Sequence, residues 1–377
     1  MKRRHALETV GAGLVGLSLA PRLFAEAPAP KRKRHWVWIT ADAEYDDEGW
    51  KRMFDRMRAA GIDAVIPEVY KGRHAHWAST HLPVKDDRLG RLLPLAKAAG
   101  LEVHAWMWTM PCLIEDVLQK HPDWYSVNAK GESAADKPAY VEYYKFLDPA
   151  RPEVREFVQR TVKELAAIDG LAGIHLDYVR HPDAILPKGL WGKYKLVQDR
   201  VYPEFDYGYS AYNREQFKKK HGIDPKDIED PTAHAAWMQY RWDCVTDLVN
   251  DYLVPAAKAG GKQTTAAVFP GPTLARSMVR QDWGRWKLDG FLPMLYRTFY
   301  EAGPEWVTAQ AREGAAAVTA PVYAGLFAVA LDAPALATDV RAALDGGADG
   351  ISVFESKTMS EEKWKALEGA LGGGGGA

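Results

Sequence analysis

The stretch Gly173-Ile-His-Leu-Asp-Tyr-Val-Arg-His-Pro182 is the most informative local pattern in the chain. Side chains alternate between the two faces of a β-strand, so His175 and Asp177 share one face and Ile174 and Leu176 share the other. The two apolar residues are expected to point toward surrounding helices. The pattern therefore predicts a strand over Ala172–Arg180, with Asp177 near its carboxyl end and His175 one layer below.

Similar strand-length apolar runs recur along the chain, each followed by a segment of helical period. The eight predicted strands are His35–Thr40, Asp63–Tyr70, Glu102–Thr109, Ala172–Arg180, Gln263–Pro270, Gly290–Tyr296, Val318–Gly325 and Gly350–Ser356. The predicted helices are Asp47–Ala60, Arg88–Ala99, Pro152–Ile168, Ala233–Ala259, Pro304–Arg312, Ala333–Leu344 and Glu361–Leu371. Glycines expected to end helices precede the next strand at Gly61, Gly100, Gly314 and Gly347.

Strands that are apolar on both faces are typical of a parallel sheet covered by helices. Eight strand–helix units over residues 35–371 predict a single α/β domain, a closed (β/α)8 TIM barrel. An open doubly wound sheet is the alternative, but it needs a glycine-rich phosphate turn after its first strand. The chain there reads Ala41-Asp-Ala-Glu-Tyr-Asp-Asp-Glu48, which is acidic.

Two long connections, residues 111–149 and 181–231, follow the third and fourth predicted strands. Both leave carboxyl ends of strands, where active sites of such barrels form. We therefore expect these segments to build the walls of the functional cleft.

Composition narrows the class of protein. The 377 residues carry a net charge of -1, with 47% hydrophobic and 26% charged residues, which is typical of a globular protein. A near-zero charge argues against nucleic acid as a partner, because phosphate neutralisation needs a basic face. The 14 Trp and 17 Tyr supply the flat surfaces on which sugars stack.

The N-terminus is predicted to be an export signal. Residues 1–27 combine a basic start containing Arg3-Arg4, a short apolar stretch and small residues near Ala25 and Ala27, which is typical of a Tat-like signal. Residues 28–34 form a basic linker, and residues 372–377 a glycine tail expected to be disordered. No later run is apolar enough for an integral membrane segment, so we expect a periplasmic or secreted protein.

Acidic residues at strand ends are the candidate catalytic groups. A half-buried carboxylate there is costly unless it is paired or used, and Arg180 could pair with Asp177. Glu68 closes the second predicted strand and Glu355 the eighth, although Ser352 and Phe354 could be the inward pair there. The predicted catalytic residues are thus Asp177, Glu68 and Glu355.

Polar and aromatic residues on the same strand faces or ends are candidate substrate contacts. His104, Trp106 and Trp108 share one face of the third strand, and Tyr296 ends the sixth. The full set of predicted contacts is Tyr70, His104, Trp106, Trp108, His175, Tyr178, Arg180, Tyr296 and Arg297.

The sequence contains no clear motif for a metal site or for a serine nucleophile. His74-Ala-His76 resembles a ligand pair, but it lies in a polar loop, and no His-Glu-x-x-His or cysteine cluster accompanies it. There is no Gly-x-Ser-x-Gly elbow and no nucleotide-binding glycine loop. We predict no metal and no cofactor, and expect Cys112 and Cys244 to be two buried thiols. Carboxylate acid–base chemistry in an aromatic cleft remains, as glycoside hydrolysis requires.

Several longer motifs extend this interpretation. They are Gly100–Trp106, His121–Trp124, Leu147–Arg155, Gly173–Pro182, His221–Pro225, the helix with Trp237 and Arg241, and Asp289–Tyr296. With these motifs the chain resembles the glycosyl hydrolase-like group numbered ten, secreted bacterial (β/α)8 barrels. The resemblance implies activity on amino-sugar polymers such as peptidoglycan glycan strands. The acid on the fourth strand and the tyrosine on the sixth also resemble chitinase-type barrels, where the acetamido group of the substrate acts as nucleophile.

The sequence therefore predicts an exported glycosidase that takes a polysaccharide or oligosaccharide. Two alternatives remain open. One is a carbohydrate-binding barrel without catalysis, which the absence of an acid in Pro321-Val-Tyr-Ala-Gly325 favours. The other is a metal-dependent hydrolase that uses His74, His76 and His104.

Overall fold

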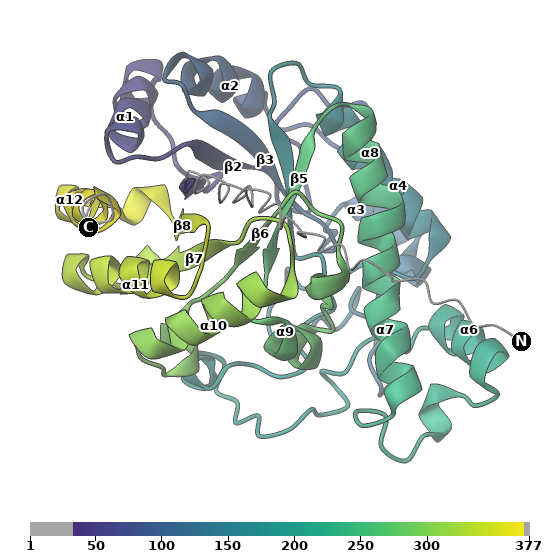
Figure 1. The fold of residues 1–377 in the computed structure, drawn as a ribbon. Coiled ribbons are helices and arrows are strands. Elements are labelled where there is room, and N and C mark those ends of the chain that lie inside the picture. Colours follow the sequence, from purple (N-terminus) through teal and green to yellow (C-terminus); the bar gives the residue numbers. More distant parts are fainter. Residues whose placement is uncertain (1–32, 373–377) are drawn as a thin grey trace, which may run out of the picture. The chain divides into compact units, whose positions relative to one another are not determined.

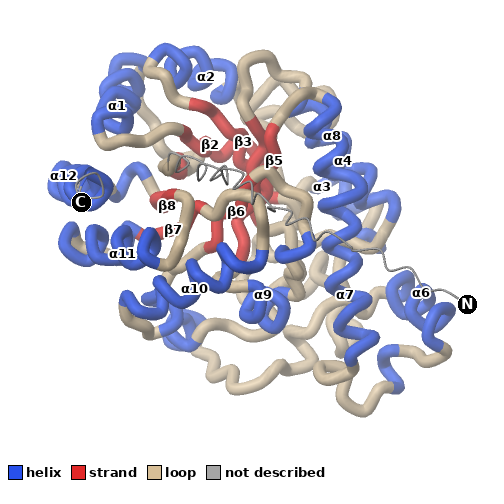
Figure 2. The backbone as a smooth tube through the Cα atoms, in the orientation of Figure 1, coloured by secondary structure: helices blue, strands red, loops and turns tan. Residues whose placement is uncertain are grey.

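The computed structural model describes residues 33–372, which form one compact unit. Its strands are β1 Trp36–Ile39, β2 Ala64–Tyr70, β3 Glu102–Trp108, β4 Gly173–Asp177, β5 Gln263–Val268, β6 Gly290–Pro293, β7 Tyr323–Phe327 and β8 Gly350–Phe354. The helices that follow strands on the outside are α1 Asp47–Ala59, α2 Arg88–Ala98, α4 Pro152–Ala166, α8 Val254–Ala259, α9 Pro272–Val279, α10 Pro304–Ala317, α11 Ala333–Asp345 and α12 Glu361–Gly372. Figures 1 and 2 show the strands inside this ring of helices.

The sheet confirms the predicted (β/α)8 barrel. All strand pairs are parallel, in the order β6-β5-β4-β3-β2-β1-β8-β7. Parallel bridges from Phe291 to Val322 and from Met294 to Gly325 join β6 to β7 and bring the two ends of the sheet together. An open doubly wound sheet is thereby ruled out.

Residues next to the helix ends explain where several helices begin and end. The Asp46 carboxylate accepts a hydrogen bond from the N–H of Gly49 at 2.7 Å and begins α1, while Pro152 occupies the first turn of α4. Gly61, Gly100 and Gly347 follow their helices with positive φ angles, as predicted.

Three predicted boundaries are wrong. Gly314 does not end a helix: it lies inside α10, where a Cβ would lie 3.2 Å from the ring of Trp283, and the helix continues to Ala317. The seventh strand consequently begins at Tyr323 rather than at Val318. The fourth strand ends at Asp177 rather than Arg180, because Tyr178 adopts a left-handed φ of 51°.

The long connections contain short elements. Residues 109–151 include α3 (Glu115–Lys120), and the connection after β4 includes α5 (Trp191–Tyr194) and α6 (Ala211–His221). The long predicted helix is three consecutive segments: α7 (Ala235–Asp247), a π-helical stretch η4 (Leu248–Leu253) and α8.

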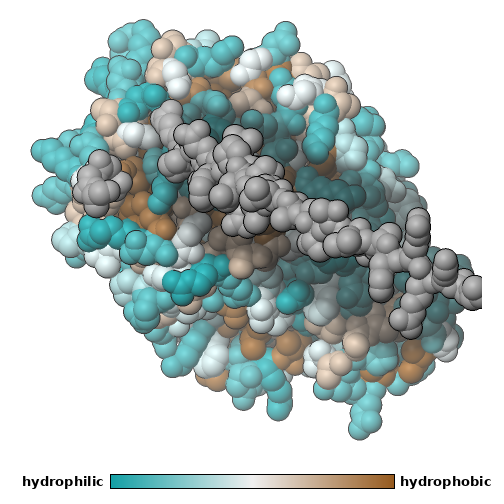
Figure 3. All heavy atoms as spheres, viewed as in Figure 1, coloured by the Kyte–Doolittle hydropathy of each residue, from teal (hydrophilic) through white to brown (hydrophobic). Residues whose placement is uncertain are grey.

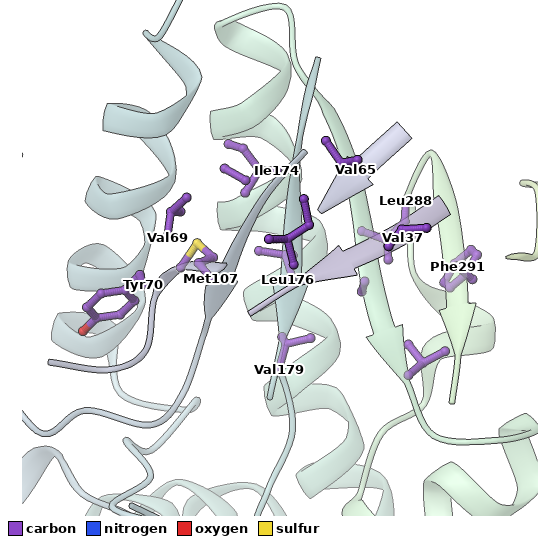
Figure 4. Packing of buried hydrophobic residues seen from close by; sticks show 14 of the residues in the cluster. Val37, Val65, Val69, Tyr70, Met107, Ile174, Leu176, Val179, Leu288 and Phe291 are labelled. Carbon is purple, nitrogen blue, oxygen red and sulfur yellow. The ribbon is translucent and has the colours of Figure 1, made fainter. Parts of the chain in front are cut away.

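Two sets of buried side chains make up the core. Outward-facing strand residues such as Ile174, Leu176 and Phe291 pack against the helices (Figure 4). Inward-facing residues fill the barrel itself, and they include Trp36, Trp38, Ile66, Trp106 and Tyr323. Hydrophilic side chains predominate around the margin of the face shown in Figure 3, with some hydrophobic side chains between them. None of the helices within residues 33–372 is long and apolar enough to cross a membrane.

Candidate active site

A cavity of about 300 Å³ lies at the carboxyl ends of the strands. Glu68 of β2, Asp177 of β4 and Asp183 of the following loop are its acidic residues. Its aromatic lining consists of Trp38, Trp106, Trp108, Tyr143, Tyr144, Tyr178, Tyr194, Phe269, Tyr296, Phe299, Tyr300, Phe327 and Phe354. A mostly apolar hollow with a few converging polar groups is the usual form of a small-molecule site.

Asp177 points into this cavity from the end of β4 and is 8% exposed. One carboxylate oxygen accepts a hydrogen bond from the indole Nε1 of Trp106 at 3.0 Å, and the other accepts one from the N–H of Tyr178 at 2.7 Å. Burial raises the pKa of Asp177 to about 6, against the lowering effect of these hydrogen bonds and of Arg180. This carboxyl group is therefore partly protonated near neutral pH.

Glu68 lies at the end of β2 and is 1% exposed. Its Oε2 accepts a hydrogen bond from the N–H of Ala41 at 2.9 Å, and the Nζ of Lys71 lies 3.9 Å from it. Burial raises the pKa of Glu68, while Lys71 and the Ala41 N–H act in the opposite direction. Glu68 thus has a direct cationic neighbour.

The two carboxylates flank β3 and share Trp106. This residue pairs in register with Glu68, and its indole bonds to Asp177. The negative charge of Glu68 contributes to the raised pKa of Asp177. Two carboxyl groups that line one cavity in different surroundings are an arrangement that can support acid–base chemistry.

Arg180 does not pair with Asp177, contrary to expectation. Its Nη1 lies 3.0 Å from Oδ2 of Asp183, and its guanidinium stacks on the rings of Tyr178 and Phe269. Arg180 still lines the cavity. Its charge still lowers the pKa of Asp177, but burial outweighs this effect and the pKa stays raised.

Aromatic rings form one wall. The ring of Trp108 lies 4.6 Å from that of Tyr178 and 5.4 Å from that of Tyr143, and the Lys71 ammonium lies 5.2 Å from its centre. Tyr296 also lines the cavity, and the rings of Phe327 and Phe354 lie 5.0 and 6.1 Å from its ring. Burial, and then the charge of Asp177, raise the pKa of Tyr296, which keeps it a neutral hydroxyl donor.

Glu355 lies outside the cavity lining. Ser352 pairs in register with Trp36, and Phe354 is the last strand residue to reach the cavity. Glu355 instead accepts a hydrogen bond from the Thr40 hydroxyl at 2.6 Å and has Lys357 at 4.0 Å. It supports Thr40, which does line the cavity.

His104 and His175 point inward but lie below the cavity. His104 packs edge-on against Trp36 at 4.5 Å, with its Nε2 3.5 Å from Glu102. Nδ1 of His175 lies 2.8 Å from the Thr265 hydroxyl. Burial lowers the pKa of both histidines, so they are neutral packing residues of the barrel interior.

Tyr70 and Arg297 are also placed away from the cavity. The β2–β3 register shifts between Glu68 and Tyr70, so Tyr70 pairs with Met107 and turns toward the helices (Figure 4). The Nε of Arg297 bonds to both carboxylate oxygens of Asp339 on α11, at 2.8 and 2.9 Å. The structure therefore gives neither residue a place at the cavity.

The histidines of the metal hypothesis do not come together. His76 bonds through Nδ1 to Asp86 at 2.8 Å, and His104 is enclosed in the barrel interior. Within residues 33–372 no group of three or more His, Cys, Asp or Glu side chains is placed to hold a metal ion. Cys112 and Cys244 are buried and unbonded, as expected.

Several lining residues were not predicted. Trp38 faces inward by the same strand alternation as Trp106, so the sequence does contain a signal for it. Lys71, Tyr143, Tyr144, Lys193 and Tyr194 come from connections without periodicity. Only the location and aromatic content of those connections pointed to them.

Comparisons with known proteins agree with this site. Residues 34–185 match the family model described as Glycosyl hydrolase-like 10, which confirms the resemblance over the segment that carries Glu68 and Asp177. A search of curated protein sequences finds no match.

Solved structures of similar fold include glycosidases. The glycoside hydrolase domain of PgaB (BpsB) from Bordetella bronchiseptica has a TM-score of 0.68 at 14% identity, covering 90% of this chain and 99% of that one. The catalytic domain of β-amylase from Paenibacillus polymyxa has a TM-score of 0.63 at 11% identity, covering 89% and 96%. A β-galactosidase from Marinomonas ef1 has 0.64 at 13%, covering 90% and 59%. At these identities the likeness concerns the fold, and with the family match it identifies a glycoside hydrolase-like barrel.

Proposed function

Starting from a glycoside hydrolase-like barrel, we propose that the chain cleaves glycosidic bonds with Asp177 as general acid. The observation that carries the proposal is a buried carboxyl with a pKa of about 6 in an aromatic cavity at the carboxyl ends of the strands. A general acid works best when its pKa lies near the working pH. Asp177 would donate its proton to the glycosidic oxygen as the bond to the anomeric carbon breaks.

Glu68 is the second carboxylate of this proposal. Lys71 and the Ala41 N–H favour its charged form, whereas Asp177 has no free cation beside it. In the charged form Glu68 can activate water or stabilise positive charge at the anomeric carbon. With N-acetylated sugars, the substrate acetamide can serve as nucleophile. We assign Tyr296, which lines the same cavity as Asp177, to hold it.

We further propose that the substrate is an amino-sugar polymer, which the sequence resemblance supports. Reducing-end release from peptidoglycan glycan strands, chitooligosaccharides and partially deacetylated poly-N-acetylglucosamine tests both proposals. We expect release from at least one polymer, and a preference for N-acetylated chains if the acetamide takes part.

Asp177→Asn is the decisive variant. It removes the transferable proton, and we expect a loss of at least 100-fold in the rate of release. For the wild-type chain, kcat/KM should fall as the pH rises above about 6, because Asp177 is then deprotonated. Glu355→Gln is the matched control, since Glu355 lies outside the cavity lining, and it should lose far less.

An inactive wild-type chain that still binds the polymers would identify a carbohydrate-binding barrel without catalysis. An active Asp177→Asn chain would remove the assigned role of Asp177. Circular dichroism of both variants at pH 8 shows whether a loss of activity reflects unfolding. Asn removes a buried charge, so we expect no loss of stability at that pH.

We also propose that the protein is exported, because its first 27 residues have the pattern of a Tat-like signal. Replacing Arg3 and Arg4 by Lys should retain the protein in the cytoplasm. Fractionation of cells that express the full chain measures this.

A further inference from the structure

A second hollow of about 420 Å³ adjoins the proposed active cavity. Lys71, Trp108 and Tyr143 line both hollows. A chain of sugars bound across the Trp108 ring would therefore pass from one hollow into the other.

Positive charge predominates in this second hollow. Arg73, His74 and Lys85 line it from the connection between β2 and α2, together with Lys71, and all four side chains are exposed. No ion pair involves Arg73 or Lys85 within residues 33–372.

Negative charge in the second hollow is weaker than the positive charge. The hollow also contains Asp42 and Glu44, but Asp42 is bonded to Lys357 at 2.7 Å. Lys71 itself faces Glu68 at 3.9 Å. Lys85 also interacts with the neighbouring Asp86 carboxylate, which is bonded to His76 and lies outside the lining of this hollow. Within the lining, Lys71, Arg73 and Lys85 thus outnumber Asp42 and Glu44.

The connection that carries these cations is held by its own backbone. The N–H of Ala75 bonds to the Pro83 carbonyl at 2.8 Å, and that of Lys85 to the Ala75 carbonyl at 2.9 Å. The Asp86 carboxylate fixes His76. In the His74-Ala-His76 motif, His76 thus anchors the loop, and both histidines line the hollow.

A close approach fixes the start of this connection. Gly72 has a φ of 78°, and a Cβ there would lie 2.7 Å from the Pro111 carbonyl oxygen. The N–H of Leu113 bonds to the Gly72 carbonyl at 2.7 Å. Arg73 is therefore presented from a backbone that is tied to the connection after β3.

We propose that this hollow is a subsite for a sugar unit that carries a carboxylate, within the same glycan that occupies the active cavity. The proposal rests on the proposed function, which places the scissile bond beside Asp177. A guanidinium binds a carboxylate through two parallel hydrogen bonds, and Lys85 adds a second positive charge. The Trp108 ring supplies the stacking surface between the two positions.

Binding to an Asp177→Asn chain tests the subsite without turnover. The ligands are a hexasaccharide with lactyl carboxylates on muramic acid, one with glucuronic acid carboxylates, and the carboxyl-reduced form of each. Calorimetric titration should show at least one carboxylated ligand binding about tenfold more tightly than its reduced form, with an advantage that shrinks in high salt. The carboxylated ligand that binds more tightly identifies the source of the carboxylate.

Arg73→Gln/Lys85→Gln, made in the same background, should remove most of that advantage and change binding of the reduced ligand by less than twofold. Lys218→Gln/Lys220→Gln on α6 is the control, since it lowers the net charge equally on a helix that lines neither hollow. Equal affinity for carboxylated and reduced ligands, or equal losses in both double variants, would overturn the subsite.

The outcomes also separate the subsite from the proposed function. Carboxylate-dependent binding without hydrolysis by the wild-type chain would overturn the glycosidase and leave the subsite in place. Hydrolysis without any carboxylate preference would overturn the subsite alone.

Discussion

Trp106 is the residue that couples the two proposed catalytic carboxylates. Its indole donates a hydrogen bond to Asp177 at 3.0 Å, and this bond lowers the pKa of Asp177 against the effect of burial. The same residue pairs in register with Glu68. Together with the Tyr178 N–H and the charge of Arg180, this bond opposes burial and so contributes to the pH range in which Asp177 carries a proton.

Trp106→Phe keeps an aromatic ring but removes the indole N–H. The pKa of Asp177 should then rise, and the alkaline fall in kcat/KM should move upward by about 0.5–1 pH unit. Trp38→Phe is the matched control, because Trp38 also lines the cavity and its indole N–H makes no hydrogen bond to Asp177. The assigned role of the Trp106 bond would be contradicted if both variants gave the same pH–rate profile. It would also be contradicted if the alkaline fall in kcat/KM of Trp106→Phe moved to lower pH.

At this scale, strand alternation predicted the inward positions of Asp177, Trp106, Trp108 and His175. Alternation does not tell how deep in the barrel an inward side chain lies: His104 and His175 face inward but lie below the cavity. Alternation also does not tell which side chains pair: Arg180 forms its ion pair with Asp183, three residues further along the chain. Both depend on side chains from other strands and loops.

At the scale of elements, two connections decide the shape of the cavity. The segment after β4 supplies Pro187, Leu190, Lys193 and Tyr194 to the lining. It packs on the turn η6 (Arg297–Tyr300), where a Cβ on Gly189 would lie 2.6 Å from the Thr298 carbonyl oxygen and 2.8 Å from that of Phe299.

Gly189→Ala should displace this wall, because the neighbouring atoms are backbone and cannot rotate away. We expect KM to rise about three- to tenfold with a smaller change in kcat, since Asp177 and Glu68 stay in place. Gly192→Ala is the control, as a Cβ there meets nothing within 4 Å. Identical steady-state kinetics for the two variants would show that this contact does not shape the site.

The sequence located both long connections but not their course. A strand's alternation is local, whereas the register shift after Glu68, which turns Tyr70 outward, depends on pairing with β3. The ion pair that draws Arg297 to Asp339 likewise joins two distant segments.

At the scale of the whole molecule, the barrel depends on closure between β6 and β7. The N–H of Leu295 bonds to the Gly325 carbonyl at 2.9 Å, and a Cβ on Gly325 would lie 2.8 Å from the Pro293 carbonyl oxygen. The repeat of strands and helices predicted the barrel, because each unit is a local pattern. A closed barrel implies that the sixth and seventh strands meet, but the close approach of Gly325 to the Pro293 carbonyl at this seam could not be predicted, because it depends on the backbone of two distant segments.

Gly325→Ala should force the seam apart and lower the free energy of unfolding by about 1–3 kcal/mol. Thermal unfolding measures the loss as a lower Tm. Gly369→Ala in α12, where a Cβ meets nothing within 4 Å, should leave the Tm unchanged or raise it, because alanine favours a helix. A Gly325→Ala chain as stable as the wild type would show that the seam tolerates a wider spacing.

The tryptophans of the cavity give the protein an optical sensor of its own occupancy. Of the 14 Trp in the chain, Trp38, Trp106 and Trp108 line the proposed active cavity, and the Trp106 indole is bonded to the carboxyl group that would transfer the proton. A sugar that displaces water from these rings, or a proton that arrives on Asp177, changes the surroundings of an emitting group directly. Intrinsic fluorescence can therefore follow ligand entry and the ionisation of Asp177 without a label, and the difference between wild type and Trp106→Phe isolates the signal of the site from that of the remaining tryptophans.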